Sequence, residues 1–131
     1  MKNFLFGFLL LMSCSVFAQT AKVAAPPAKF KELKHAFGKI PQNKPVTYVF
    51  KFTNASSKAL IIESALAGCG CTTPEYPKQP IAKGKEGTIR VTYNAAAVGA
   101  FTKDVTVKFV GITEPVVLNI SGEVLAEKPK S

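Results

Sequence analysis

The chain has 131 residues, a length that suits one folded domain better than two. A hydrophobic fraction of 47% and a charged fraction of 19% exclude an intrinsically disordered chain. Three cysteines are too few for a disulfide-rich scaffold, and a single histidine argues against a histidine-rich metalloenzyme. The formal net charge is +9, but the chain has a single arginine, so we expect no nucleic-acid partner.

Residues 1–18 have the pattern of a secretory signal peptide. Lys2 precedes an apolar run over residues 4–12, and Val16 and Ala18 occupy the −3 and −1 positions before Gln19. This run is too short to span a bilayer, which requires about 20 apolar residues, so we expect no transmembrane helix. We predict an exported protein, periplasmic or extracellular, in a compartment where disulfides form.

A second interpretation of the same segment concerns Cys14. Residues 11–14 resemble a lipobox, in which Cys14 would carry a lipid and anchor the protein to the outer membrane. Cleavage after Ala18 is the preferred prediction, because Met12 suits a lipobox poorly. In that case Cys14 is an apolar residue of the signal peptide and is removed with it.

The remainder of the chain divides into a linker, one domain and a tail. Residues 19–29 contain small residues and two prolines and have the composition of a linker. Residues 30–125 are expected to form the folded domain, with a polar tail over residues 126–131. The length of this domain is close to the roughly 100 residues of an immunoglobulin-like sandwich.

Within the domain, apolar and polar residues alternate with a period of two, which indicates β-strands. In residues 60–66 this pattern places Leu60, Ile62 and Leu66 on one face. No segment has the pattern of an amphipathic helix, and alternation favours antiparallel sheets with one buried face each. We therefore predict an all-β, immunoglobulin-like antiparallel sandwich of about seven strands, including residues 33–40 (weakly), 46–53, 60–66, 88–93, 101–109 and 116–124.

Two cysteines one residue apart, Cys69 and Cys71, follow the expected strand over residues 60–66. They precede a segment with several prolines that is expected to be a loop up to Gly84. They could be small residues in a sharp turn, either reduced or oxidised to a structural clip. They could instead form a strained, redox-active disulfide, because the ring they close is very small. As thiolates they could bind Cu or Zn, but His35 or a second molecule would have to supply further ligands.

His35 is expected on the same strand face as Leu33 and Phe37. A single histidine on an apolar strand is more often a hydrogen-bonded structural group than a metal ligand. Its part in any metal site therefore depends on whether the fold brings it close to Cys69 and Cys71.

Residue patterns typical of enzymes are missing from the sequence. It has no Gly-x-Ser-x-Gly nucleophile motif and no glycine-rich phosphate loop, and its acidic residues are scattered singly. We therefore predict a protein that is not an enzyme and has no cofactor. The interpretation with Cu or Zn remains the alternative.

Several of these motifs, taken together, resemble the bacterial domain of unknown function 1573 family. They are residues 35–40 (HAFGKI), Phe50-x-Phe52-x-Asn54, Leu60-x-Ile62, residues 69–72 (CGCT) with Pro74, and Ile120-x-Gly122-x-Val124. The resemblance implies a secreted or surface-tethered immunoglobulin-like domain and carries no established activity. One departure is Gly68, where the family pattern has serine before the first cysteine.

These observations predict an exported, non-enzymatic binding or envelope-assembly module. Its partner would be a protein or another cell-envelope component. Thiol-redox chemistry or soft-metal handling through residues 69–71 is the alternative function.

Overall fold

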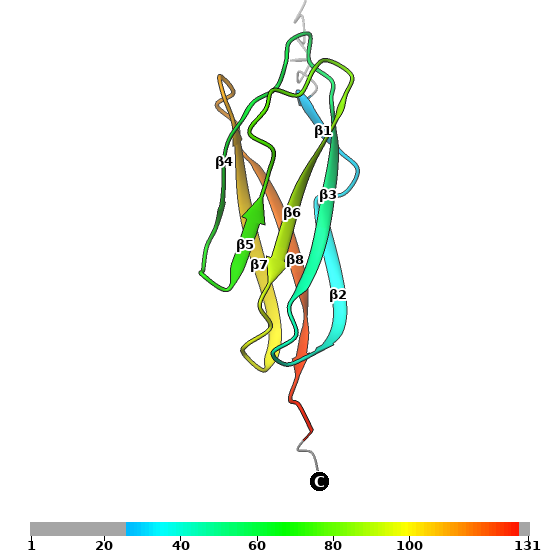
Figure 1. The fold of residues 1–131 in the computed structure, drawn as a ribbon, viewed down its shortest axis with the longest axis vertical. Coiled ribbons are helices and arrows are strands. Elements are labelled where there is room, and N and C mark those ends of the chain that lie inside the picture. The colour runs from blue at the N-terminus through cyan, green and yellow to red at the C-terminus, as the bar shows by residue number, and fades with distance from the viewer. Residues whose placement is uncertain (1–25, 129–131) are drawn as a thin grey trace, which may run out of the picture.

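The computed structural model describes residues 26–128, which fold into eight β-strands without a helix (Figure 1). The predicted signal peptide and Cys14 lie outside the described residues. The described part of the chain has no helix capable of spanning a membrane. In chain order the strands are β1 (Ala28–Phe30), β2 (Lys34–Pro41), β3 (Val46–Asn54), β4 (Ile62–Ala67), β5 (Thr72–Glu75), β6 (Glu86–Tyr93), β7 (Gly99–Phe109) and β8 (Val116–Leu125).

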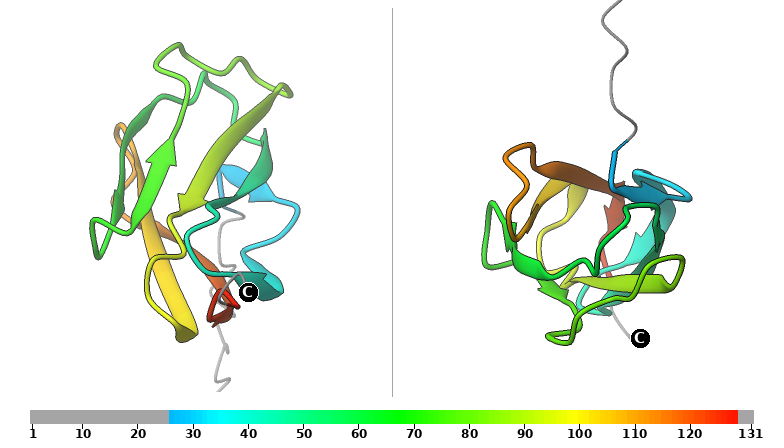
Figure 2. Two further views of the ribbon diagram at one scale, coloured as in Figure 1. Left: turned by 60° about the horizontal axis from the view of Figure 1, so that its bottom comes forward. Right: turned by 90° about the horizontal axis from the view of Figure 1, so that it is seen from above.

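The strands form two four-stranded sheets that face each other (Figure 1, Figure 2). The first sheet has the order β1-β3-β6-β5, and the second has the order β2-β8-β7-β4. This is the constant-type immunoglobulin arrangement, with the first strand divided between the two sheets as β1 and β2. The predicted all-β, immunoglobulin-like sandwich is therefore confirmed.

One pairing differs from the antiparallel prediction, because β2 runs parallel to β8. Residues 31–33 carry the chain from the first sheet to the second without reversing it, so β2 arrives beside β8 in the same direction (Figure 1). Alternation could not distinguish this case, because an edge strand with one packed face has the same pattern in either direction. A register shift between Ala36 and Lys39 accommodates Gly38, whose φ is +74°.

The sequence located six of the about seven predicted strands, and the structure adds two, which makes eight. β1 begins at Ala28, two residues before the expected start of the domain. β5 lies within the segment that was expected to be a loop, and it contains Pro74. Proline is compatible with this position because β5 is the edge strand of its sheet and pairs only with β6.

The core lies between the sheets and consists mainly of the alternate residues that the sequence pattern indicated. One residue of that pattern, Leu66, is instead 66% exposed. A register shift between Ile62 and Ser64 reverses the alternation in β4, so Ala65 is buried and Leu66 faces outwards. The largest fully buried apolar side chains are Phe50, Phe52, Ile89, Val91, Val105, Val107, Phe109, Leu118, Ile120 and Val124.

Candidate functional site

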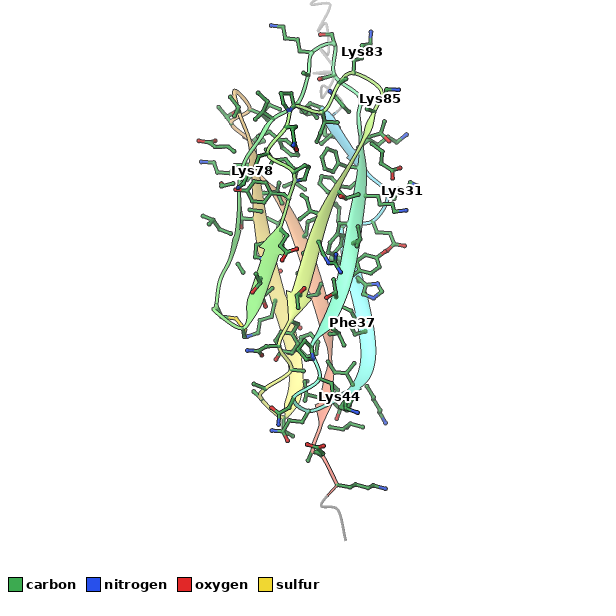
Figure 3. All side chains as sticks on the ribbon, viewed as in Figure 1. Lys31, Phe37, Lys44, Lys78, Lys83 and Lys85 are labelled. Carbon is green, nitrogen blue, oxygen red and sulfur yellow. A yellow bond between two sulfur atoms is a disulfide. The ribbon has the colours of Figure 1, made fainter. Side chains whose placement is uncertain are left out.

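Cys69 and Cys71 lie in the turn between β4 and β5, where the chain passes from the second sheet to the first. Their sulfur atoms are joined in a disulfide, and their Cα atoms are 5.3 Å apart. The sulfur–sulfur bond lies at the turn that connects β4 with β5 (Figure 3). The structure thus shows an oxidised clip at the point where the two sheets are connected.

Contacts hold the disulfide turn from both sides. The hydroxyl of buried Thr72 lies 3.9 Å from Sγ of Cys69 and 3.7 Å from Sγ of Cys71. The backbone N–H of Asn94, at the end of β6, donates to the carbonyl of Cys71 at 2.9 Å. Cys71 also packs against the core, but both cysteines are only half-buried. The two cysteines are therefore partly exposed, and the backbone of their turn is held in place.

His35 does not lie with the cysteines. It is in β2 at one edge of the second sheet, whereas the disulfide follows β4 at the opposite edge, with β7 and β8 between them. Within residues 26–128, no group of three or more His, Cys, Asp or Glu side chains could hold a metal ion. A metal site that joins His35, Cys69 and Cys71 within one chain is therefore not formed. In the disulfide, neither sulfur is available as a thiolate ligand.

His35 instead belongs to an aromatic cluster that connects the open edges of the sheets. Its ring stacks on Tyr48 of β3, with centroids 3.6 Å apart and planes 7° apart. The ring of Phe37 meets His35 edge-on at 4.7 Å, and Tyr48 meets Phe50 in the same way at 4.9 Å. The sequence suggested a hydrogen-bonded histidine, but the contacts found around it in the described residues are ring contacts.

The hydroxyl of Tyr48 extends this cluster to the surface, where it donates to the carboxylate of Glu32. This hydrogen bond, with some desolvation and the negative charge of Glu32, raises the pKa of Tyr48 above its ordinary value of 10.0. Glu32, just before β2 of the second sheet, is therefore held to Tyr48 on β3 of the first sheet.

The free edge of β4 is a second feature of the site, and it was not predicted from the sequence. β4 pairs only with β7, so its other edge has no strand beside it within residues 26–128. Across the outer face of the sheet, Leu66 pairs with Thr106 of β7, and Thr106 pairs with Val117 of β8. Val117 is 48% exposed. The free edge therefore adjoins a small exposed apolar surface, formed by Leu66 and Val117 with Thr106 between them.

The other strand edges carry features that hinder pairing with another chain. β1 has three residues. β2 has Lys34 and Lys39 and an irregular register, and β5 has Pro74 and Glu75. β4 also has Glu63 and a register shift between Ile62 and Ser64, but residues 64–68, which follow them, contain no charged residue and no proline. This uncharged run is the sequence signal by which the free edge could have been recognised.

Comparison with known proteins identifies the family and the fold. The family model described as "Protein of unknown function (DUF1573)" matches residues 28–124. No curated protein matches the chain.

Solved structures share the fold at low sequence identity. A Porphyromonas gingivalis W83 protein of unknown function is 11% identical at a TM-score of 0.62, over 81% of this chain and 51% of its own. The chain thus spans about half the length of that protein. The ASH/PapD-like domain 7 of human CEP192 is 11% identical at a TM-score of 0.67, and the match covers 87% of this chain and 98% of that domain. The YadV chaperone is 12% identical at a TM-score of 0.50, and the match covers 81% of this chain and 55% of the chaperone.

Proposed function

The chain belongs to the DUF1573 family of proteins of unknown function, and from the features of its own surface we propose that it is an exported, non-enzymatic binding module. The β4 edge would receive an extended segment of a partner protein as an additional strand. The observation that carries this proposal is the edge of β4, which has no partner strand within residues 26–128, is uncharged over residues 64–67 and lies beside exposed Leu66.

This geometry fits the general requirements for strand addition. Unpaired backbone groups at a sheet edge supply hydrogen bonds to an incoming strand, and neighbouring side chains select its alternate residues. Leu66 would contact an apolar side chain of that strand, whereas Val117 lies on β8, with β7 and β4 between it and the added strand. YadV, a protein of similar fold, is described as a chaperone.

Export is the second part of the proposal. It is supported by the signal-peptide pattern in residues 1–18 and by the Cys69–Cys71 disulfide, because disulfides persist mainly in oxidising compartments. N-terminal sequencing and intact mass of the protein isolated from its cells would locate the mature N-terminus. An unprocessed chain with reduced cysteines would contradict export.

Affinity capture from an envelope extract, followed by hydrogen exchange on the captured complex, tests the β4 edge. Leu66→Lys places a charge beside the edge and is expected to abolish capture. Val98→Lys is the control, because Val98 is similarly exposed, at 56%, but lies in the loop before β7. Bound partner should slow amide exchange in β4. The proposal would be contradicted if both variants lost capture of the partner equally, or if bound partner slowed amide exchange only in a strand other than β4.

Thiol–disulfide exchange at Cys69 and Cys71 is a second candidate function, favoured by a disulfide between two half-buried cysteines. An incoming thiolate would attack one sulfur, form a mixed disulfide and release the other cysteine as a thiolate. A second thiol would then resolve the mixed disulfide, so that two electrons pass to the protein and the thiols are oxidised. A disulfide that closes a ring this small adds only about 1.6 kcal/mol to the free energy of unfolding through loop closure. Stabilisation alone is therefore a weak reason for this disulfide.

Equilibration in glutathione redox buffers, followed by thiol alkylation and mass spectrometry, tests this second candidate. We expect reversible reduction at a potential within the range of glutathione, with Cys69→Ser/Cys71→Ser as the inert control. Titration of the reduced protein with Cu(I) and Zn would test soft-metal binding by the freed thiolates. A disulfide that resists reduction throughout would count against both chemistries.

A further inference from the structure

The end of the domain at which β1 begins is organised around the buried side chain of Asn54. Its Nδ2 donates to the carbonyls of Lys58 and Ile81, each at 2.8 Å. Its Oδ1 accepts from the backbone N–H of Ser56 at 2.9 Å, and its backbone carbonyl accepts from Gly84 N–H at 2.8 Å. One side chain thus holds together the β3–β4 loop and the β5–β6 turn.

These two loops carry four lysines. Lys78 lies over the ring of Tyr76. We call the other three, Lys58, Lys83 and Lys85, the basic tip. All three are exposed, and none forms an ion pair within the described residues. Figure 3 shows Lys83 and Lys85 projecting from this end of the domain. The nearest acidic residue in sequence is Glu86. Its carboxylate forms an ion pair with Lys31, with Nζ and Oε2 3.5 Å apart. The loops therefore present uncompensated positive charge on a rigid base.

Apolar groups lie beside the basic tip. Lys58 borders a hollow of about 310 Å³ that is also lined by Pro27, Leu60, Val110 and Ile112. Val110, which follows β7, is 54% exposed. The backbone N–H of Ala55 donates to the carbonyl of Pro27 at 2.8 Å, so the start of the described chain lies at this end.

We propose that the basic tip docks the domain onto a membrane surface rich in anionic lipids. The lysine ammonium groups would contact lipid phosphates, and Val110 would enter the interface beside them. Lysine acts as a point charge and suits a fluid layer of phosphates, whereas specific recognition of planar anionic groups favours arginine, which this end lacks. A lipid surface also accounts for the exposed apolar residue among the lysines, as a soluble polyanion does not.

The opposite end of the domain has acidic residues among its lysines. Lys39 of β2 lies opposite Glu123 of β8, and Glu127 follows β8. Lys44 lies in the β2–β3 turn at that end, as Figure 3 shows. Substitution of three lysines at that end is therefore a control. It changes the net charge by the same amount, but those lysines have acidic neighbours.

Sedimentation with lipid vesicles tests the proposal, using the chain as isolated from its cells. Vesicles of three parts phosphatidylcholine to one part phosphatidylglycerol are compared with phosphatidylcholine alone. Each lysine near an anionic surface contributes roughly a fivefold change in affinity, so K58Q/K83Q/K85Q is expected to weaken binding roughly 100-fold. K39Q/K44Q/K128Q removes the same charge and is expected to change binding less than roughly threefold. Added salt should weaken wild-type binding.

Two single substitutions distinguish the basic tip from the β4 edge. Val110→Ser should weaken binding to anionic vesicles, and Leu66→Lys should leave it unchanged, because the β4 edge is a different surface. Equal thermal midpoints for all variants would show that folding is intact. Equal losses in the two triple variants, comparable binding to neutral vesicles, full competition by polyglutamate at equal charge, or no binding by the wild type would each overturn the proposal.

Discussion

The ring of His35 lies parallel to that of Tyr48 at a centroid distance of 3.6 Å, so one pair of side chains joins the edge strand of one sheet to the other sheet. On this side of the sandwich, β1 covers only residues 52–54 of β3, and the stack lies beyond that cover. The conspicuous histidine is therefore a structural element at the seam between the sheets. It is remote from the disulfide.

Replacing His35 with alanine is expected to lower the free energy of unfolding by about 1–2 kcal/mol, because it removes the stack with Tyr48 and the edge contact with Phe37. His35→Phe retains an aromatic ring and should recover most of this loss. Urea denaturation of the three proteins provides the comparison. A wild-type midpoint for His35→Ala would show that the stack contributes nothing to stability.

The hydrogen bond from Tyr48 to Glu32 predicts a change at high pH. The pKa of Tyr48 is raised, so the folded chain holds this proton more tightly than the unfolded chain. The resulting stabilisation is complete below the ordinary value of 10.0 and is lost as the pH rises through the folded-state pKa. Glu32→Gln should move the phenolate absorbance of Tyr48 to lower pH. Glu123→Gln, on the other sheet, should leave the titration curve unchanged.

Asn54→Ala is expected to lower the free energy of unfolding by about 2–4 kcal/mol, because it removes a buried side chain that forms four hydrogen bonds. Asn119→Ala is the matched control. Its amide donates to Asp104 in a more exposed position, so a loss of about 1 kcal/mol is expected. Thermal unfolding measures both changes, and limited proteolysis should reveal looser loops around Lys58 and Lys83. Equal destabilisation by the two substitutions would contradict a special role for Asn54.

Two glycines should respond differently to alanine. A Cβ at Gly87 would lie 2.6 Å from Cδ1 of Ile81 and closer still to the ring of Phe52, so Gly87→Ala should destabilise by about 1–3 kcal/mol. A Cβ at Gly70, between the two cysteines, would meet nothing within 4 Å. Gly70→Ala should therefore retain the disulfide and change stability by less than about 0.5 kcal/mol. Denaturation together with thiol counting checks both expectations.

How far the sequence predicts the structure differs between the core and the edges. Alternation in residues 46–53 and 101–109 is sufficient to place Phe50, Phe52, Val105 and Val107 in the core, because each such strand buries one face. The same logic fails at Leu66, where one register shift reverses the faces of β4. Local pattern carries no information about where a ladder slips, since the partner strand decides the register.

The composition indicated one modest domain, and the motifs indicated its family. The all-β class, most strands and the unusual Cys69-Gly70-Cys71 turn were also readable from residue types alone, because they depend on local preference and periodicity. Only the tertiary structure separated His35 from the cysteines and left the β4 edge without a partner strand in residues 26–128. It also gathered Lys58, Lys83 and Lys85 around Asn54. These features depend on strand order and register, which are determined by contacts between residues distant in the chain.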